Sequence, residues 1–201
     1  MQKLAVMGGT FNPIHMGHIQ MAKAAVSEFG CDKVLFITSG NPPHKRAKQV
    51  LDASIRFHMT HLAICDDPRF FESDIETQKA TYSYTTQTME ILNQQYPDTE
   101  IYFVIGSDSL ADLLSWKDPE KLFSITRFLV FPREGLDVPI EELTNKYRQL
   151  FGAKITYIPY PVVNISSTYL REQMALGNWE KVSPFIPPKV FSYIKEHELY
   201  S

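Results

Sequence analysis

LAVMGGTFNPIHMGH, residues 4–18, joins a short apolar run to a glycine-rich turn and then to two histidines. Leu4 to Met7 has the length of a buried strand, and the apolar residues between 19 and 29 recur at helical spacing. Gly8 and Gly9 let the backbone approach an anion closely, and the helix that follows points its free N–H groups at the same place. The stretch therefore predicts a phosphate site between the first strand and the first helix.

Further apolar, β-branched or aromatic runs predict more strands, at residues 34–38, 101–105, 128–131 and 155–158. Helical patterns lie between them, and alternation of strands and helices is typical of parallel β-α-β units. We expect an α/β fold of the Rossmann-like, doubly wound type, with a mainly parallel sheet and helices on both faces. Loops fall at 40–49, 132–139 and 160–165, where such a sheet binds its ligands.

Two proline-marked sites predict where later helices begin. Asp118 is expected to cap a helix whose first residue is Pro119, and Pro187 with Pro188 opens a helical segment that runs to about His197. At 201 residues, the chain fits one domain, 1–201, with a small C-terminal helical portion from about 166.

Composition narrows the classes of partner and compartment. The net charge of −3 gives no general attraction for nucleic acid or an anionic membrane, so we expect neither as a partner. Cys31 and Cys65 are too few for a disulfide framework and lack metal-type spacing. The first apolar run stops at Gly8, too early for a signal peptide. We therefore expect a cytoplasmic protein.

His15 and His18 flank Gly17, which would place two imidazole donors on one side of a bound phosphate. A metal pair or a buried histidine is the alternative, but zinc needs three or four ligands and no matching third ligand is nearby. We therefore expect no protein metal site. His58 and His61 have the same spacing without glycine, and there a solvated helix face is expected.

His15-Met16-Gly17-His18 resembles the HxGH signature of the nucleotidyltransferase superfamily. Residues 164–171, NISSTYLR, are similar to the ISSTxxR element of the same superfamily. Residues 164–171 are expected to begin a helix. Hydroxyl groups at its start can cap it, which is a purely structural role, or can bind the distal phosphates of ATP together with Arg171. Because a parallel sheet gathers the carboxyl ends of its strands, we expect the two elements to meet at one crevice.

Three more segments resemble the bacterial nicotinate-nucleotide adenylyltransferase family, so the resemblance covers nearly the whole chain. They are PPHK at 42–45, SYTTQT at 83–88, and IGSD at 105–108 followed by Trp116. Arg133 stands where this family often has a loop arginine. The family often has Phe-Asp-Pro where this chain has Phe11-Asn12-Pro13, which puts in doubt any role of a carboxylate there.

The resemblance implies transfer of the adenylyl group of ATP to nicotinate mononucleotide, with release of pyrophosphate. Mg²⁺ is expected to enter with ATP, held by phosphate oxygens and water. The catalytic residues implied are His15, His18, Lys45 and Arg171. Those implied for ATP are Gly8, Gly9, Thr10, Phe11, His15, His18, Gly106, Asp108, Ser166, Ser167, Thr168 and Arg171. Those implied for the nicotinate nucleotide are Thr85, Trp116, Lys117, Lys45 and Arg133.

Three of these residues, Lys45, Trp116 and Asp108, also have ordinary structural interpretations. Lys45 is a charge that closes over phosphates or a solvated surface lysine. Trp116 is a stacking platform for the pyridine ring or a core tryptophan. Thr85 starts a helix whose N–H groups suit the nicotinate carboxylate. Asp108 binds a ribose, orders water around magnesium, or caps a helix.

Other functions remain as alternatives. A sister adenylyltransferase would act on nicotinamide mononucleotide or on phosphopantetheine. A nucleotide-binding regulator would keep the fold without turnover. An NAD-dependent oxidoreductase is disfavoured, since the G-x-G-x-x-G fingerprint is absent. The expected partners are the small molecules ATP and nicotinate mononucleotide, and a homo-oligomer is left open.

Overall fold

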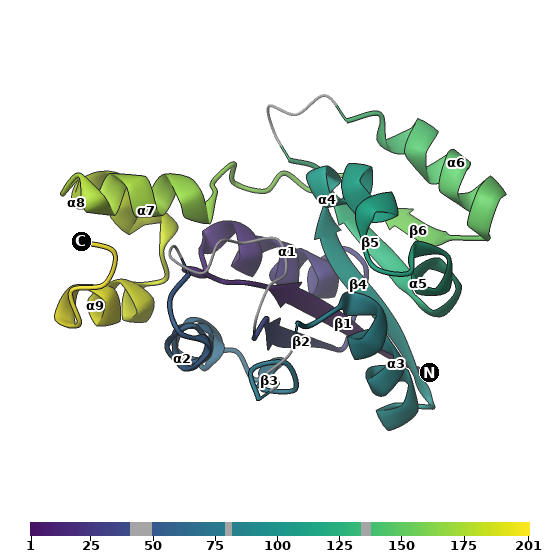
Figure 1. The fold of residues 1–201 in the computed structure, drawn as a ribbon, viewed down its shortest axis with the longest axis horizontal. Helices are drawn as coiled ribbons and strands as arrows, with labels where there is room; N and C mark the ends of the chain where they lie inside the picture. The colour runs from purple at the N-terminus through teal and green to yellow at the C-terminus, as the bar shows by residue number, and fades with distance from the viewer. Residues whose placement is uncertain (41–49, 79–81, 134–137) are drawn as a thin grey trace.

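The computed structural model describes residues 1–40, 50–78, 82–133 and 138–201. Within these ranges, six parallel strands form one sheet in the order β3-β2-β1-β4-β5-β6 (Figure 1). The strands are β1 (Gln2–Gly9), β2 (Lys33–Thr38), β3 (Phe70–Ser73), β4 (Thr99–Gly106), β5 (Arg127–Phe131) and β6 (Lys154–Tyr157). This order is the doubly wound arrangement expected from the sequence, which confirms the predicted fold class.

Nine α-helices are seen in the described residues. They are α1 (Met16–Ser27), α2 (Ala53–Ile64), α3 (Thr85–Gln95), α4 (Ser107–Asp112), α5 (Pro119–Ile125), α6 (Ile140–Phe151), α7 (Ser167–Ala175), α8 (Trp179–Val182) and α9 (Pro188–Glu196). Two short 3₁₀ turns, Leu113–Ser115 and Ser183–Phe185, link neighbouring helices. No helix in the described parts of the chain is long and apolar enough to cross a lipid bilayer.

The strands divide their side chains between two cores, because successive residues point to opposite faces. In β1, Ala5 and Met7 face one core, while Leu4 and Val6 face the other. The first core is closed by α1, α2 and the helices from α7 onward, and the second by α3 to α6. The sheet is therefore buried on both faces, which explains its continuous apolar strands.

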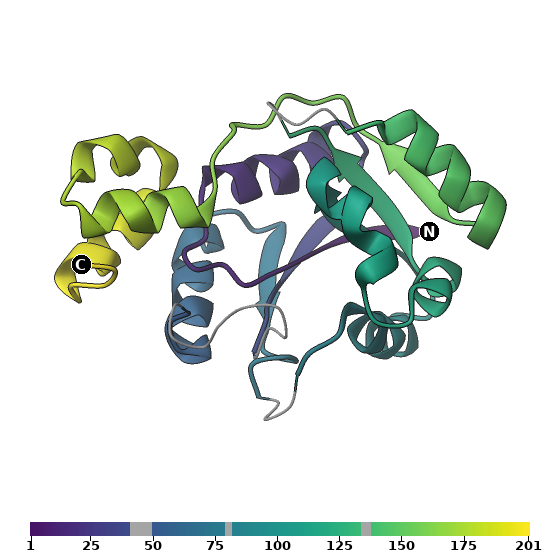
Figure 2. The same cartoon turned by 45° about the horizontal axis from the view of Figure 1, so that its top comes forward.

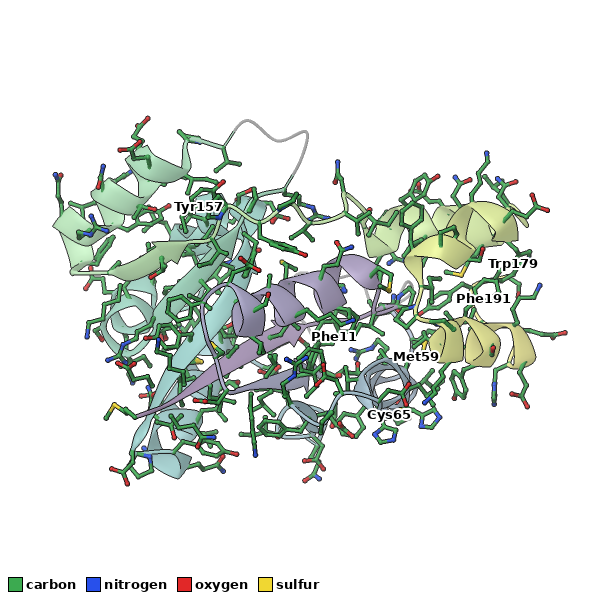
Figure 3. The ribbon with its side chains drawn as sticks, turned by 180° about the vertical axis from the view of Figure 1, so that it is seen from behind. Phe11, Met59, Cys65, Tyr157, Trp179 and Phe191 are labelled. Atoms are coloured by element: carbon green, nitrogen blue, oxygen red, sulfur yellow. The ribbon has the colours of Figure 1, made fainter. Side chains whose placement is uncertain are left out.

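The last three helices gather at one end of the molecule beside α1 and α2 (Figures 1 and 2). Their apolar faces join the first core, and the rings of Trp179 and Phe191 meet edge to face 6.1 Å apart between α8 and α9 (Figure 3). Pro188 begins α9, as its sequence predicts. Shared core residues, including Met59 of α2, tie this portion to the sheet.

One strand, β3, was not predicted from the sequence, and one predicted cap, Asp118, is wrong. β3 consists of Phe70, Phe71, Glu72 and Ser73, and two apolar residues followed by two polar ones are too short an apolar run to predict a strand. α5 begins at Pro119 as expected, but Asp118 has a left-handed backbone and its side chain makes no cap. In α7 the cap is Ser166, whose hydroxyl accepts from the Tyr169 N–H at 3.2 Å.

Candidate active site

The crevice lies where the chain leaves the central strands in opposite directions. β1 and β4 are neighbours in the sheet. The chain leads from β1 to β2 on one side and from β4 to β5 on the other. β1 ends at Gly9 and β4 ends at Gly106, so both carboxyl ends open at the same edge of the sheet. A doubly wound sheet binds its ligands at this switch point.

Two pockets of similar size open at this edge, and they share a wall. One has a volume of about 250 Å³ and the other about 240 Å³. Gly8, Phe103 and Trp116 line both of them. Two ligands bound side by side would therefore meet at these three residues.

The 250 Å³ pocket, here called the α3 pocket, lies at the start of α3. Residues of the SYTTQT segment line it, and α3 begins at Thr85 as expected. Trp116 and Lys117 enter from the turn after α4, and Gly9 and Thr10 from the end of β1. Thr86 donates its hydroxyl to the Lys117 carbonyl at 2.6 Å, which holds this wall in place. The structure thus brings Thr85, Trp116 and Lys117 together.

The 240 Å³ pocket, here called the histidine pocket, contains the paired histidines. His15, His18, Gly106 and Asp108 line it. So does Arg133, which resemblance assigned to the nicotinate nucleotide and which the structure places on the other side of Trp116. Arg133 forms an ion pair with Asp108 and donates to the Ile165 carbonyl at 3.2 Å.

The geometry of His15 and His18 follows from their places at the start of α1. His15 is the residue before the helix, and its backbone N–H donates to Nδ1 of His18 at 3.2 Å. The two rings stack with centroids 3.6 Å apart. Gly17 allows this, since a Cβ there would lie 3.1 Å from Nδ1 of His15.

His15 is buried and uncharged in this arrangement. Its side chain is 5% exposed, and burial, followed by the charge of Arg133, lowers its pKa to about 3. Nδ1 of His15 has no hydrogen-bond partner among the described residues. A buried polar atom without a partner at a pocket wall favours binding of a ligand that supplies one.

α7 lies directly against the loop that follows β1. The Ser167 hydroxyl donates to the Pro13 carbonyl at 2.9 Å, and Arg171 donates to the Asn12 carbonyl at 2.9 Å and the Thr168 hydroxyl at 3.3 Å. The second signature element is thus in direct contact with the loop that leads into the first, across more than 150 positions of sequence. Loss of a hydroxyl at Ser167 would loosen the loop as well as any phosphate contact.

Several predicted site residues are placed differently from the rest. Gly9 and Thr10, which resemblance assigned to ATP, line the α3 pocket and not the histidine pocket. Among the described residues, neither pocket is lined by Phe11, Ser166, Ser167, Thr168 or Arg171. Lys45 lies outside the described residues. Phe11 is 2% exposed, and its ring meets that of His18 edge to face at 5.0 Å, so it supports the histidine from the core. His58 and His61 are exposed on α2, as expected for a solvated helix face.

Arg56 borders the site but was not predicted from the sequence. It is 1% exposed and donates to four backbone carbonyls at 2.7–2.9 Å. The acceptors are Thr10, Ser39, Gly40 and Leu51. A single arginine in a helix carries no pattern, so nothing short of the folded structure identifies it.

A protein metal centre has no ligand set in the part of the chain that the structure describes. No group of three or more His, Cys, Asp or Glu residues there is placed to hold an ion. The Asp108 carboxylate, at the edge of the histidine pocket, is paired with Arg133.

Comparisons with known proteins agree with this geometry. The family model for cytidylyltransferase-like proteins matches residues 6–173. A probable nicotinate-nucleotide adenylyltransferase from Clostridium kluyveri is 38% identical over all of both chains, and one from Thermoanaerobacter sp. is 39% identical over 98% of this chain and 94% of its own. The solved Plasmodium falciparum nicotinic acid mononucleotide adenylyltransferase complexed with NaAD is 21% identical and covers 100% of this chain and 98% of its own, with a TM-score of 0.86, which shows the shared fold.

A doubly wound sheet with paired histidines at its switch point, matched by that family model, defines a nucleotidyltransferase of the cytidylyltransferase-like class. Within this class, the chain belongs to the nicotinate-nucleotide adenylyltransferase family, because full-length relatives are well above 30% identical to it.

Proposed function

We propose that this protein transfers the adenylyl group of ATP to nicotinate mononucleotide, giving nicotinate adenine dinucleotide and pyrophosphate. The shared wall of Gly8, Phe103 and Trp116 between two pockets carries the proposal, since the reaction needs two nucleotides held end to end. The full-length relatives named for this activity support it.

The histidine pocket is proposed to hold ATP. The buried, neutral His15 and its neighbour His18 would face the α and β phosphates, and free N–H groups at the start of α1 add a partial positive charge. Asp108 would accept a hydrogen bond from the ribose. Ser166, Ser167, Thr168 and Arg171, at the start of α7, would hold the distal phosphates. We assign Arg133 to this side because it lines this pocket.

The α3 pocket is proposed to hold nicotinate mononucleotide. Trp116 offers a ring face to the pyridine, and the N–H groups at the start of α3, around Thr85, suit its carboxylate. Lys117 would neutralise part of the nucleotide's charge. Lys45 is proposed to contact phosphates on either side, as family resemblance implies.

The chemistry then requires alignment and charge stabilisation. An oxygen of the nicotinate mononucleotide phosphate attacks the α-phosphorus of ATP, an oxygen–phosphorus bond forms, and the bond to the β-phosphate oxygen breaks. The attacking oxygen is already anionic, so no general base is needed. Negative charge grows on the leaving pyrophosphate, where the histidines and Arg171 are proposed to stabilise it.

Mg²⁺ is proposed to arrive as the ATP complex and to stay on the phosphate oxygens. This ion retains several waters and needs few protein ligands. The pairing of Asp108 with Arg133 suits that arrangement, because the carboxylate is already neutralised by an arginine.

The test is pyrophosphate release with Mg²⁺–ATP and each of nicotinate mononucleotide, nicotinamide mononucleotide and phosphopantetheine. We expect turnover on the first and a loss of about 10²-fold or more in kcat for His18→Ala. His58→Ala is the matched control, since His58 is exposed on α2. Preference for another acceptor would reassign the substrate, and ATP binding without turnover on any acceptor would indicate a regulator.

A further inference from the structure

Tyr200, which follows α9, touches the loop that carries the paired histidines. Its hydroxyl donates to Oδ1 of Asn12 at 2.8 Å, across 188 positions of sequence. Asn12 is 1% exposed and lies three residues before His15. A residue of the C-terminal helical portion therefore contacts the phosphate loop directly.

The Asn12 loop is held in an uncommon conformation by contacts from outside it. Phe11 has a φ of 47°, a left-handed value that costs energy for a residue with a side chain. Around it, the Asn12 side chain accepts from the Leu51 N–H at 3.3 Å, and the Asn12 carbonyl accepts from Arg171 at 2.9 Å. The bond from Tyr200 to the Asn12 side chain is shorter than the one from Leu51.

Tyr200 is suited to donate at this place. Its ring packs against the core on the α1 face of the sheet, which fixes the hydroxyl position. Burial raises the pKa of this hydroxyl, whereas the nearby charges of Arg171 and Arg56 lower it less. The group therefore stays protonated at neutral pH and remains a donor to the Asn12 oxygen.

We propose that Tyr200 is a positioning residue for adenylyl transfer: by binding Asn12 it holds the His15–His18 segment in register with the reacting phosphates. This inference rests on the proposed function. The path is short, because Asn12 and His15 belong to one loop and the His15 N–H is bonded to the His18 ring. Small displacements of aligned groups lower the rate more than they weaken ground-state binding.

The primary test is Tyr200→Phe, which removes one oxygen and keeps the ring. We expect kcat to fall about 5- to 30-fold, the effect of one buried hydrogen bond, while KM for either substrate changes by less than about threefold. Tyr193→Phe is the matched control, because this half-buried tyrosine of the same helical portion contacts the rings of His58 and His197. The control should stay within about twofold of the parent.

A double-mutant cycle separates positioning from packing. In an Asn12→Ala background Tyr200 has lost its partner, so Tyr200→Phe should have no further effect on kcat. In an Asn12→Asp background an acceptor remains, and the loss should persist. Thermal unfolding of each full-length variant, measured alongside, shows that the proteins compared are folded.

Two results overturn the inference while leaving the proposed function intact. In the first, the wild-type protein turns over nicotinate mononucleotide and the Tyr200→Phe variant has the same kcat. The other is an equal loss from Tyr200→Phe with and without the Asn12 side chain. A wild-type protein inactive on every acceptor would instead contradict the proposed function.

Discussion

The rings of His15 and His18 stack 3.6 Å apart at an interplanar angle of 25°, while the His15 N–H donates to the His18 ring. Two positive charges at this separation would repel strongly, so the stack favours at most one protonated ring. His15 is the buried partner, and burial together with the charge of Arg133 keeps it neutral. The pair is therefore proposed to act as hydrogen-bond donors to a phosphate.

Stability should fall in acid because of His15. Its pKa is about 3 in the folded chain, against 6.5 for an unperturbed histidine, so the unfolded chain binds the proton more readily. Above pH 6.5 both states leave this histidine neutral, and the free energy of unfolding has its full value. As the pH falls from 6.5 toward 3, the free energy of unfolding decreases by about 1 kcal/mol per pH unit. The free energy of unfolding of the ligand-free protein, measured with urea at several pH values, should fall less steeply with decreasing pH for His15→Asn than for the parent. His58→Asn should have the same pH dependence as the parent. Identical slopes would contradict the burial of a neutral His15.

Arg56 should contribute strongly to the stability of the folded protein. Arg56→Met leaves the carbonyls of Thr10, Ser39, Gly40 and Leu51 without their donor, and we expect the free energy of unfolding to fall by about 3–5 kcal/mol.

Two further variants test the Arg56 bonds. Arg56→Lys keeps the charge but loses the planar fork, so an intermediate loss is expected. Arg148→Met, at an exposed arginine of α6, is the control and should stay within about 0.5 kcal/mol. Urea denaturation measures the free energy of unfolding of all three variants. An Arg56→Lys variant as stable as the parent would mean that the positive charge, and not the planar guanidinium, provides the stabilisation.

Arg133 should affect ATP more than the acceptor. It lines the histidine pocket, so Arg133→Gln should raise KM for ATP about 10-fold or more and leave KM for nicotinate mononucleotide nearly unchanged. Lys117→Gln is the paired variant, since Lys117 lines the α3 pocket and should show the reverse pattern. Steady-state kinetics with each substrate varied in turn decides. An acceptor-specific effect of Arg133→Gln would return this residue to the role that family resemblance suggested.

Trp116 should report on both pockets. The chain has two tryptophans, so Trp179→Phe leaves Trp116 as the single tryptophan. Because Trp116 lines the wall between the pockets, ATP and nicotinate mononucleotide should each change its emission when added alone. In the reciprocal Trp116→Phe protein the remaining Trp179 packs against Phe191 and Lys195, away from the crevice, and neither ligand should alter it. A response to one nucleotide only would show that the wall is not shared.

Local pattern was enough to predict most of the fold. Five apolar runs with helical patterns between them predicted a parallel sheet, since period and length distinguish strands from helices. The edge strand β3 was not predicted because it has only two consecutive apolar residues, Phe70 and Phe71. The other edge strand, β6, was predicted because residues 155–158 form a run of β-branched and aromatic residues. The start of α9 at Pro188 was visible because proline is favoured in the first turn of a helix.

The sequence by itself also predicted the chemistry of the site, because His15-Met16-Gly17-His18 and residues 164–171 are contiguous motifs that can be recognised without the fold. Tertiary structure alone decided the rest. It placed Arg133 beside Asp108, brought Arg56 to four carbonyls and Tyr200 to Asn12, and set Trp116 between two pockets. These contacts join residues far apart in the chain, and a lone arginine or tyrosine carries no local signal of its partner until folding brings the two together.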